Sequence, residues 1–184
     1  MGFGPSLLET GVSCAVQLNS ELTDEQKALY QDRVAVRTIL NTFRRVAIVG
    51  LSTDRQKASY FVGSYLKSAG WEVIPVNPKA DTILGLKAYP DLKSIPGKVD
   101  VVDIFRPAAD VGPIVDDAVA VGAKAVWQQL RIINLEAAEK ARRAGLLSIV
   151  DLCIKMEHGR YAGGLHEAGM NTELVHARRE HRFL

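Results

Sequence analysis

The sequence has no hydrophobic run of about 18 residues, the length that a membrane-spanning helix needs, so we expect no transmembrane segment. It has only two cysteines among 184 residues, too few for a disulfide framework. No cationic stretch precedes an apolar one at the N-terminus, so no signal peptide is expected. Together these absences predict a reduced, cytoplasmic setting.

Charge of one sign is not in excess, because 23 Lys and Arg stand against 21 Asp and Glu, for a net charge of +2. We therefore expect no nucleic acid and no membrane surface as partner. Hydrophobic residues make up 47% and charged residues 24% of the chain, which is typical of one globular domain at this length. The predicted organisation is a flexible lead (1–20), an N-terminal helix (21–45), a ligand-binding domain (46–158) and a C-terminal tail (159–184).

The N-terminal helix is predicted over residues 24–43. Thr23 and Gln26 fit a capping box, in which each side chain satisfies a free backbone N–H group of the first turn. Leu29, Val36 and Leu40 then recur at helical spacing. We expect this amphipathic helix to pack on the domain that follows.

From residue 46 the pattern changes to short apolar strands that alternate with helices. Strands are predicted at 46–49, 71–76, 99–105, 124–128 and 146–150, and helices at 59–69, 108–121 and 135–144. The fold class is therefore α/β: a Rossmann-like, doubly wound parallel sheet of about five strands with helices on both faces. Pro75 lacks a ladder N–H, which indicates either the end of a strand or an edge strand. A short extra strand is expected within 83–89 and a terminal helix within 172–182.

The loop after the first strand has features of a phosphate-binding turn. Gly50 permits a tight turn or close backbone approach, and Ser52 stands where a dinucleotide fingerprint has its second glycine. The following helix points its N-terminus at the loop, which favours an anion. Thr53 offers a second hydroxyl, and Arg55 or Lys57 offers charge. The alternative, an ordinary turn with a capping serine, stays open on this loop alone.

The second strand ends in Asn77-Pro78-Lys79. Folds that bind NAD have an acidic residue about 20 positions beyond the glycine loop, where it holds the ribose hydroxyls. A cation in that place disfavours NAD and suits an additional phosphate, as in coenzyme A (CoA) or NADP. A solvated lysine on a turn is the alternative.

The third strand ends in Ile104-Phe105-Arg106, immediately before Pro107. At the carboxyl end of a strand, an aromatic ring and a guanidinium can flank an adenine and pair with a phosphate. A core Phe105 beside a solvated Arg106 is an equally good interpretation.

Several segments in this order resemble the small stand-alone CoA-binding proteins, which are similar to the CoA-binding domain of the succinyl-CoA synthetase α subunit. The segments are 46–52, 73–79, 101–107, 125–130 and 151–158, and the resemblance covers roughly residues 36–158. Where the family pattern has a glycine after the fourth segment, this chain has Leu130-Arg131-Ile132.

The resemblance implies a Rossmann-like sheet that binds CoA or an acyl-CoA as its cofactor. It implies that Ser52, Thr53, Asp54 and Arg55 meet the pyrophosphate and that Lys79 meets the ribose phosphate. Ile104, Phe105 and Arg106 would line the path of the adenine or the pantetheine.

We expect a non-catalytic or regulatory module, because no nucleophile–base–orienter set can be assembled from the sequence. Cys153 lies near Lys155 and His158 and could be a reactive thiol, but a buried small hydrophobe is the preferred interpretation. The four histidines are spaced by 8, 10 and 5 residues, which does not suit a metal site.

Two other functions stay open: an NADP-dependent oxidoreductase, and a CoA-ligase component that needs a separate ATP-grasp subunit. The oligomeric state is equally open, whether a homo-oligomer or a chain that works with a separate enzyme.

Overall fold

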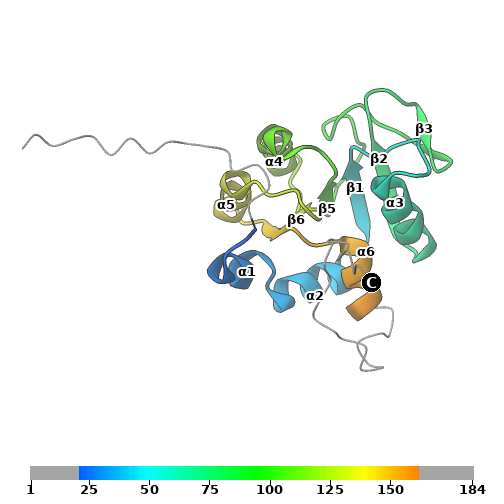
Figure 1. The fold of residues 1–184 in the computed structure, drawn as a ribbon. Coiled ribbons are helices and arrows are strands. Elements are labelled where there is room, and N and C mark those ends of the chain that lie inside the picture. Colours follow the sequence, from blue (N-terminus) through cyan, green and yellow to red (C-terminus); the bar gives the residue numbers. More distant parts are fainter. Residues whose placement is uncertain (1–20, 162–184) are drawn as a thin grey trace, which may run out of the picture.

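The computed structural model describes residues 21–161 and has a five-stranded parallel sheet at its centre (Figure 1). The strand order is β2-β1-β5-β6-β7, as expected for a doubly wound sheet. The strands are β1 (Arg45–Val49), β2 (Glu72–Val76), β5 (Val101–Ile104), β6 (Ala125–Gln128) and β7 (Leu147–Val150). Because β2 lies at the edge of this sheet, the expected position of Pro75 is confirmed.

Helices cover both faces of the sheet (Figure 1). One face is covered by α2 (Arg33–Thr42), α3 (Ala58–Ser68) and α6 (Ile154–Tyr161), which bury apolar side chains against Ile48 and Trp127.

The other face is covered by α4 (Val111–Ala120), which follows a 3-10 turn (Ala108–Asp110), and by α5 (Leu135–Arg143). Strand side chains alternate between the two cores, as the period of two requires. No helix within the described range is long and apolar enough to cross a membrane.

The single helix predicted over 24–43 is wrong, because the segment forms two helices. The capping box of Thr23 and Gln26 does begin α1 (Asp24–Tyr30). A new helix, α2, then begins because the Asp32 carboxylate accepts a hydrogen bond from the Ala35 N–H at 2.9 Å. The break lets Tyr30 pack in a separate small core beside α5 and β7.

The single extra strand expected within 83–89 is instead an antiparallel hairpin of two short strands, β3 (Thr82–Ile83) and β4 (Leu86–Lys87). Its turn places Leu84 and Gly85 at φ of +56° and +72°. Leu84 is not a glycine, so the hairpin was not evident as a two-residue turn.

Helix α6 was not predicted and runs through Tyr161, across the expected end of the domain at residue 158. The expected lead over 1–20 and terminal helix over 172–182 lie outside the described residues.

Candidate functional site

A crevice of about 690 Å³ opens at the carboxyl edge of the sheet, near the ends of β1 and β5. Its walls come from the loops after β1, β2 and β5, from residues 90–92 and from the start of α4. Neighbouring crossovers leave β1 and β5 toward opposite sides, so this is the switch point at which open α/β sheets bind ligands. Six predicted site residues line it: Gly50, Ser52, Asn77, Pro78, Lys79 and Arg106.

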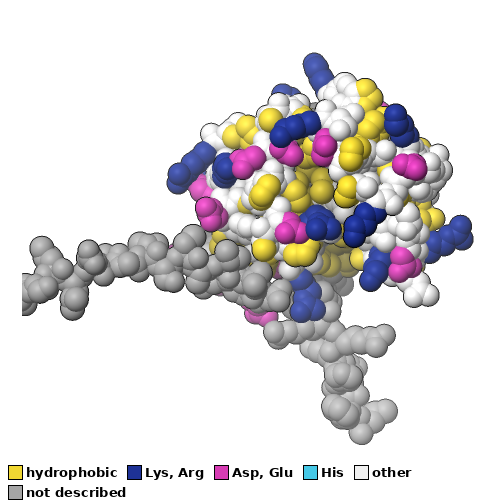
Figure 2. Space-filling model, turned by 90° about the horizontal axis from the view of Figure 1, so that it is seen from above, with side chains coloured by type: hydrophobic (Ala, Val, Ile, Leu, Met, Phe, Trp, Pro, Cys, Tyr) yellow, Lys and Arg dark blue, Asp and Glu magenta, His cyan; other side chains and the backbone are white. Residues whose placement is uncertain are grey.

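Figure 2 views the molecule from the side on which β1 ends in Figure 1. Hydrophobic side chains gather near the centre of this face, and Lys and Arg side chains stand around them.

Gly50 forms part of the crevice floor because its backbone lies against the end of β5. Its φ is +87°, and a Cβ atom there would lie 2.6 Å from the carbonyl oxygen of Phe105. The Gly50 N–H also donates to the Val76 carbonyl at 2.9 Å. Only glycine therefore lets the ends of β1, β2 and β5 meet this closely.

Asn77 holds the loop after β2 beside the loop after β1. Its Nδ2 donates to the Leu51 carbonyl at 2.8 Å, and its Oδ1 accepts from the Lys79 N–H at 2.9 Å. These bonds close a tight turn around Pro78 and leave the Lys79 side chain exposed at the crevice rim.

Arg106 reaches the crevice but is paired with Asp110, whose Oδ2 lies 2.8 Å from the guanidinium. The two side chains are 51% and 45% exposed, so the pair stabilises the fold little and can be exchanged for another anion. Asp91 and Asp117 also line the crevice, so its charge is mixed.

Ile104 and Phe105 are not among the residues that line the crevice. Ile104 is fully buried and faces the core under α4, so its expected place on the ligand path is wrong. Phe105 packs partly buried against the opposite core, and what it adds to the crevice floor is its carbonyl oxygen against Gly50. The reason is register, because consecutive side chains of a central strand enter opposite cores.

The loop between β1 and α3 is divided between two pockets. Ser52 lines the crevice, whereas Thr53 and Arg55 line a second pocket. Asp54 shapes the turn: its N–H donates to the Ser52 Oγ at 3.0 Å, and its Oδ1 accepts from the Gln56 N–H at 2.9 Å. Lys57 is the exposed N-cap of α3 and forms no side-chain cap bond. Ligand contact by these residues stays a prediction.

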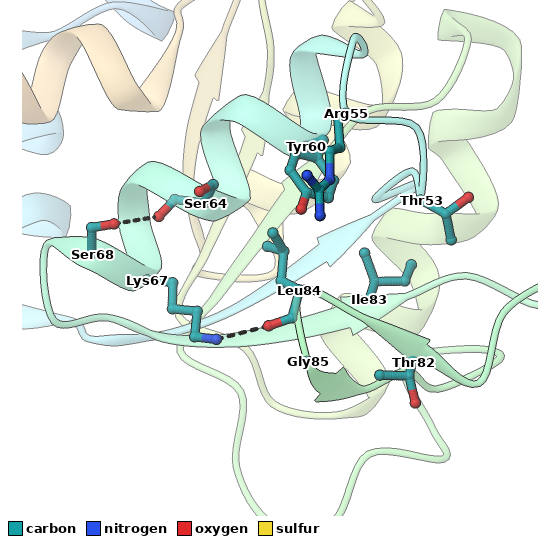
Figure 3. Close-up of a pocket in the computed structure, with 10 residues that line it drawn as sticks. All are labelled: Thr53, Arg55, Tyr60, Ser64, Lys67, Ser68, Thr82, Ile83, Leu84 and Gly85. Carbon is teal, nitrogen blue, oxygen red and sulfur yellow. Dashed lines mark hydrogen bonds between the residues drawn. The ribbon is translucent and has the colours of Figure 1, made fainter.

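The second pocket, called the hairpin pocket below, lies between α3 and the β3–β4 hairpin and has a volume of about 630 Å³ (Figure 3). The sequence did not indicate this pocket, because its hairpin wall has no recognisable motif. The residues that line it are Thr53, Arg55, Tyr60, Ser64, Lys67, Ser68, Thr82, Ile83, Leu84 and Gly85.

A buried polar pair lies under the carboxyl edge. The Gln129 Nε2 donates to the Asp103 Oδ1 at 2.7 Å, and the Oδ2 of this fully buried carboxyl group has no partner within residues 21–161. Burial raises the pKa of Asp103 to about 7. The sequence did not reveal this group, because the contact joins residues from two different strand ends.

Cys153 packs against the core that contains Trp127. Burial raises the pKa of its thiol, so the nucleophilic thiolate is disfavoured. His158, the base considered from sequence, has its Nδ1 3.0 Å from the Tyr65 hydroxyl. Across the part of the chain that the structure describes, no cluster of three His, Cys, Asp or Glu side chains could hold a metal ion.

The loop that lacks the family's glycine keeps a glycine-like backbone. Arg131 has φ of +65°, and its N–H donates to the Asp151 Oδ1 at 2.6 Å. The hydrogen bond offsets part of the strain of a left-handed residue.

A family model described as a CoA binding domain matches residues 44–159 of this chain. The uncharacterized protein YneT of Bacillus subtilis is 36% identical over 126 residues, which cover 68% of this chain and 93% of that protein. The ADP-forming acetate–CoA ligase II of Archaeoglobus fulgidus is 31% identical over 133 residues, 71% of this chain but only 19% of the ligase.

Among solved structures, a hypothetical protein from Pyrococcus horikoshii is similar with a TM-score of 0.68 and 38% identity. The match covers 77% of this chain and 94% of that protein. The shared fold thus extends over most of this chain and nearly all of that protein.

Proposed function

Because the chain belongs to the CoA-binding domain family, we propose that it binds CoA or an acyl-CoA, with the 3′-phospho-ADP part in the crevice. The observation that supports this most is the position of Lys79. It stands on the rim of a switch-point crevice, on a turn that Asn77 holds in place, where NAD-binding folds have a carboxylate.

Charge and shape support the same ligand. Lys79 and Arg106 are the two cations of the crevice, and the Arg106 ion pair with Asp110 is exposed enough to be exchanged for a phosphate. The crevice lining also includes apolar side chains such as Leu92 and Ile114, which suit one face of an adenine ring.

The loop before α3 supplies donors for the pyrophosphate. Among the described residues, no protein group accepts a hydrogen bond from the N–H of Thr53 or of Arg55. Backbone N–H groups before a helix N-terminus bind phosphate well. In this proposal the pyrophosphate lies across the loop, against these backbone N–H groups.

We infer that binding occurs without turnover, so that the protein acts as a carrier or regulatory module. Cys153 is partly buried, and burial raises the pKa of its thiol, so it offers no activated nucleophile, which supports this role.

A second candidate follows from the likeness to the acetate–CoA ligase, of which this chain resembles only a fifth. The chain would then be the CoA-binding component of a ligase whose ATP-dependent part is another subunit. Turnover of acetate, CoA and ATP that appears only after addition of that subunit would favour this candidate.

The proposal is tested by thermal unfolding with CoA, NADP and NAD at equal concentrations. CoA should stabilise most; a ligand at 100 times its dissociation constant adds about 2.7 kcal/mol to the free energy of unfolding. For a domain of this length, each kcal/mol of added stability raises Tm by roughly 2–4 °C. Greater stabilisation by NADP than by CoA would overturn the proposal and favour the oxidoreductase.

A further inference from the structure

The hairpin pocket is built by one face of α3 and by the hairpin that faces it. Tyr60, Ser64 and Lys67 follow one another at intervals of four and three residues, so their side chains share a helix face. Figure 3 shows the Arg55 side chain extending from the preceding loop beside Tyr60 and Leu84, over the space between helix and hairpin.

Among the residues that the structure describes, no ion pair neutralises the two cations of this pocket. The Lys67 Nζ donates to the Leu84 carbonyl at 2.7 Å, a neutral acceptor that leaves the ammonium charge unpaired. Arg55 forms no ion pair with any residue in the described range 21–161. None of the described residues that line the pocket is acidic.

The pocket also offers hydrogen-bond donors with little protein competition for them. No described residue accepts from the hydroxyl groups of Tyr60 and Ser64, and Lys67 keeps two further N–H groups. The crevice differs, because Asp91, Asp110 and Asp117 line it beside its two cations.

From this geometry we propose that the hairpin pocket binds a carboxylate or phosphate group of a small organic anion. A guanidinium and an ammonium with neighbouring hydroxyls match the oxygens of such a group. The volume of about 630 Å³ exceeds the needs of one phosphate ion and accommodates several carbon atoms as well.

The anion has two sources that the structure allows. It is either a free small molecule or the far end of an acyl group on CoA held in the crevice. Ser52 lines the crevice and the adjacent Thr53 lines the hairpin pocket, so one loop forms a wall of both. The second source rests on the function proposed above, whereas the first does not.

Calorimetry with inorganic phosphate and with succinate tests the free source. Lys67→Gln and Tyr60→Phe should each weaken binding by about five- to tenfold, as expected for the loss of one polar or charged contact. Lys87→Gln is the matched control, because Lys87 lies on β4 of the same hairpin, outside the pocket. Tyr60→Phe removes one oxygen atom and leaves the Lys67 bond to the hairpin intact.

Succinyl-CoA and butyryl-CoA test the tethered source, since their acyl chains are equal in length and differ in a terminal carboxylate. If the anion is the end of an acyl group on CoA, the wild type binds succinyl-CoA about five- to tenfold more tightly than butyryl-CoA. Lys67→Gln and Tyr60→Phe then reduce this preference while CoA itself binds as before.

If free anions bind and the two variants weaken this binding, the anion site is supported even if CoA does not bind. A failure of CoA binding alone would therefore contradict only the proposed function. The inference is overturned if neither anion binds and succinyl-CoA shows no preference. It is also overturned if the two pocket variants behave like Lys87→Gln.

Discussion

The carbonyl oxygen of Phe105 lies against Gly50 so closely that a Cβ atom on Gly50 would come within 2.6 Å of it. This contact joins the ends of the two central strands at the floor of the crevice. The first glycine of a dinucleotide fingerprint permits the tight turn after the strand, and at Gly50 the same lack of a side chain also permits this contact between two backbone segments.

Gly50→Ala should therefore destabilise the fold more than a Gly→Ala substitution whose only cost is an alanine at positive φ. Gly122 is the matched control: its φ is +72°, and a Cβ there would meet nothing within 4 Å. We expect Gly122→Ala to cost about 1–2 kcal/mol. Gly50→Ala should cost at least about 1 kcal/mol more, because Cβ overlaps backbone. Urea unfolding measures both, and equal costs would show that the end of β5 moves freely.

Lys79→Glu tests whether the crevice rim contacts the 3′-phosphate. Affinity for CoA should fall by about 1–3 kcal/mol, and affinity for dephospho-CoA should fall less, because only CoA has that phosphate. Lys124→Glu makes the same change in net charge at an exposed position just before β6, at the opposite edge of the sheet. Calorimetry that finds equal losses for both ligands would remove Lys79 from phosphate recognition.

Asp103 should make the protein less stable as the pH rises from about 4 to 7. Its pKa is about 7 in the folded state, against an ordinary value of 3.8. In this window the unfolded chain has lost the proton that the folded state retains, so the free energy of unfolding falls by up to roughly 1.4 kcal/mol per pH unit. Above pH 7, Asp103 is ionised in both the folded and the unfolded state, so the free energy of unfolding falls no further on its account.

The Asp103→Asn variant isolates this effect, since its amide oxygen can still accept from Gln129. The difference in unfolding free energy between wild type and variant should shift in favour of the variant across that window. A difference that stays constant from pH 4 to 8 would mean that Asp103 titrates normally.

Cys153 should react slowly and take no part in thioester chemistry. Burial raises its thiol pKa, so little thiolate is present at pH 7. In a Cys14→Ser background, iodoacetamide should modify Cys153 at least about tenfold more slowly in the folded protein than in urea. Incubation with acetyl-CoA should leave the thioester intact. If acetyl-CoA is hydrolysed and Cys153→Ala abolishes this hydrolysis, the predicted low reactivity of Cys153 and the proposed binding without turnover are both wrong.

The sequence by itself determined the alternation of strands and helices, because strand and helix periodicity are properties of short segments. The capping box at Thr23 and the edge position of Pro75 were equally local, since each depends on hydrogen bonds that one residue can or cannot make. The same reasoning failed at Asp32, where a cap divides what hydrophobic spacing presents as one helix.

Tertiary structure alone decided which of the predicted site residues line the same cavity. Six of them meet in the crevice, whereas Thr53 and Arg55 line the hairpin pocket and Ile104 enters the core. In the hairpin pocket, Lys67 of α3 donates to the carbonyl of Leu84 in the hairpin turn, and no sequence motif links these two segments. Contacts of this kind between distant residues depend on the strand order and on the path of each crossover connection. Packing over the whole sheet sets both, rather than neighbours in the sequence.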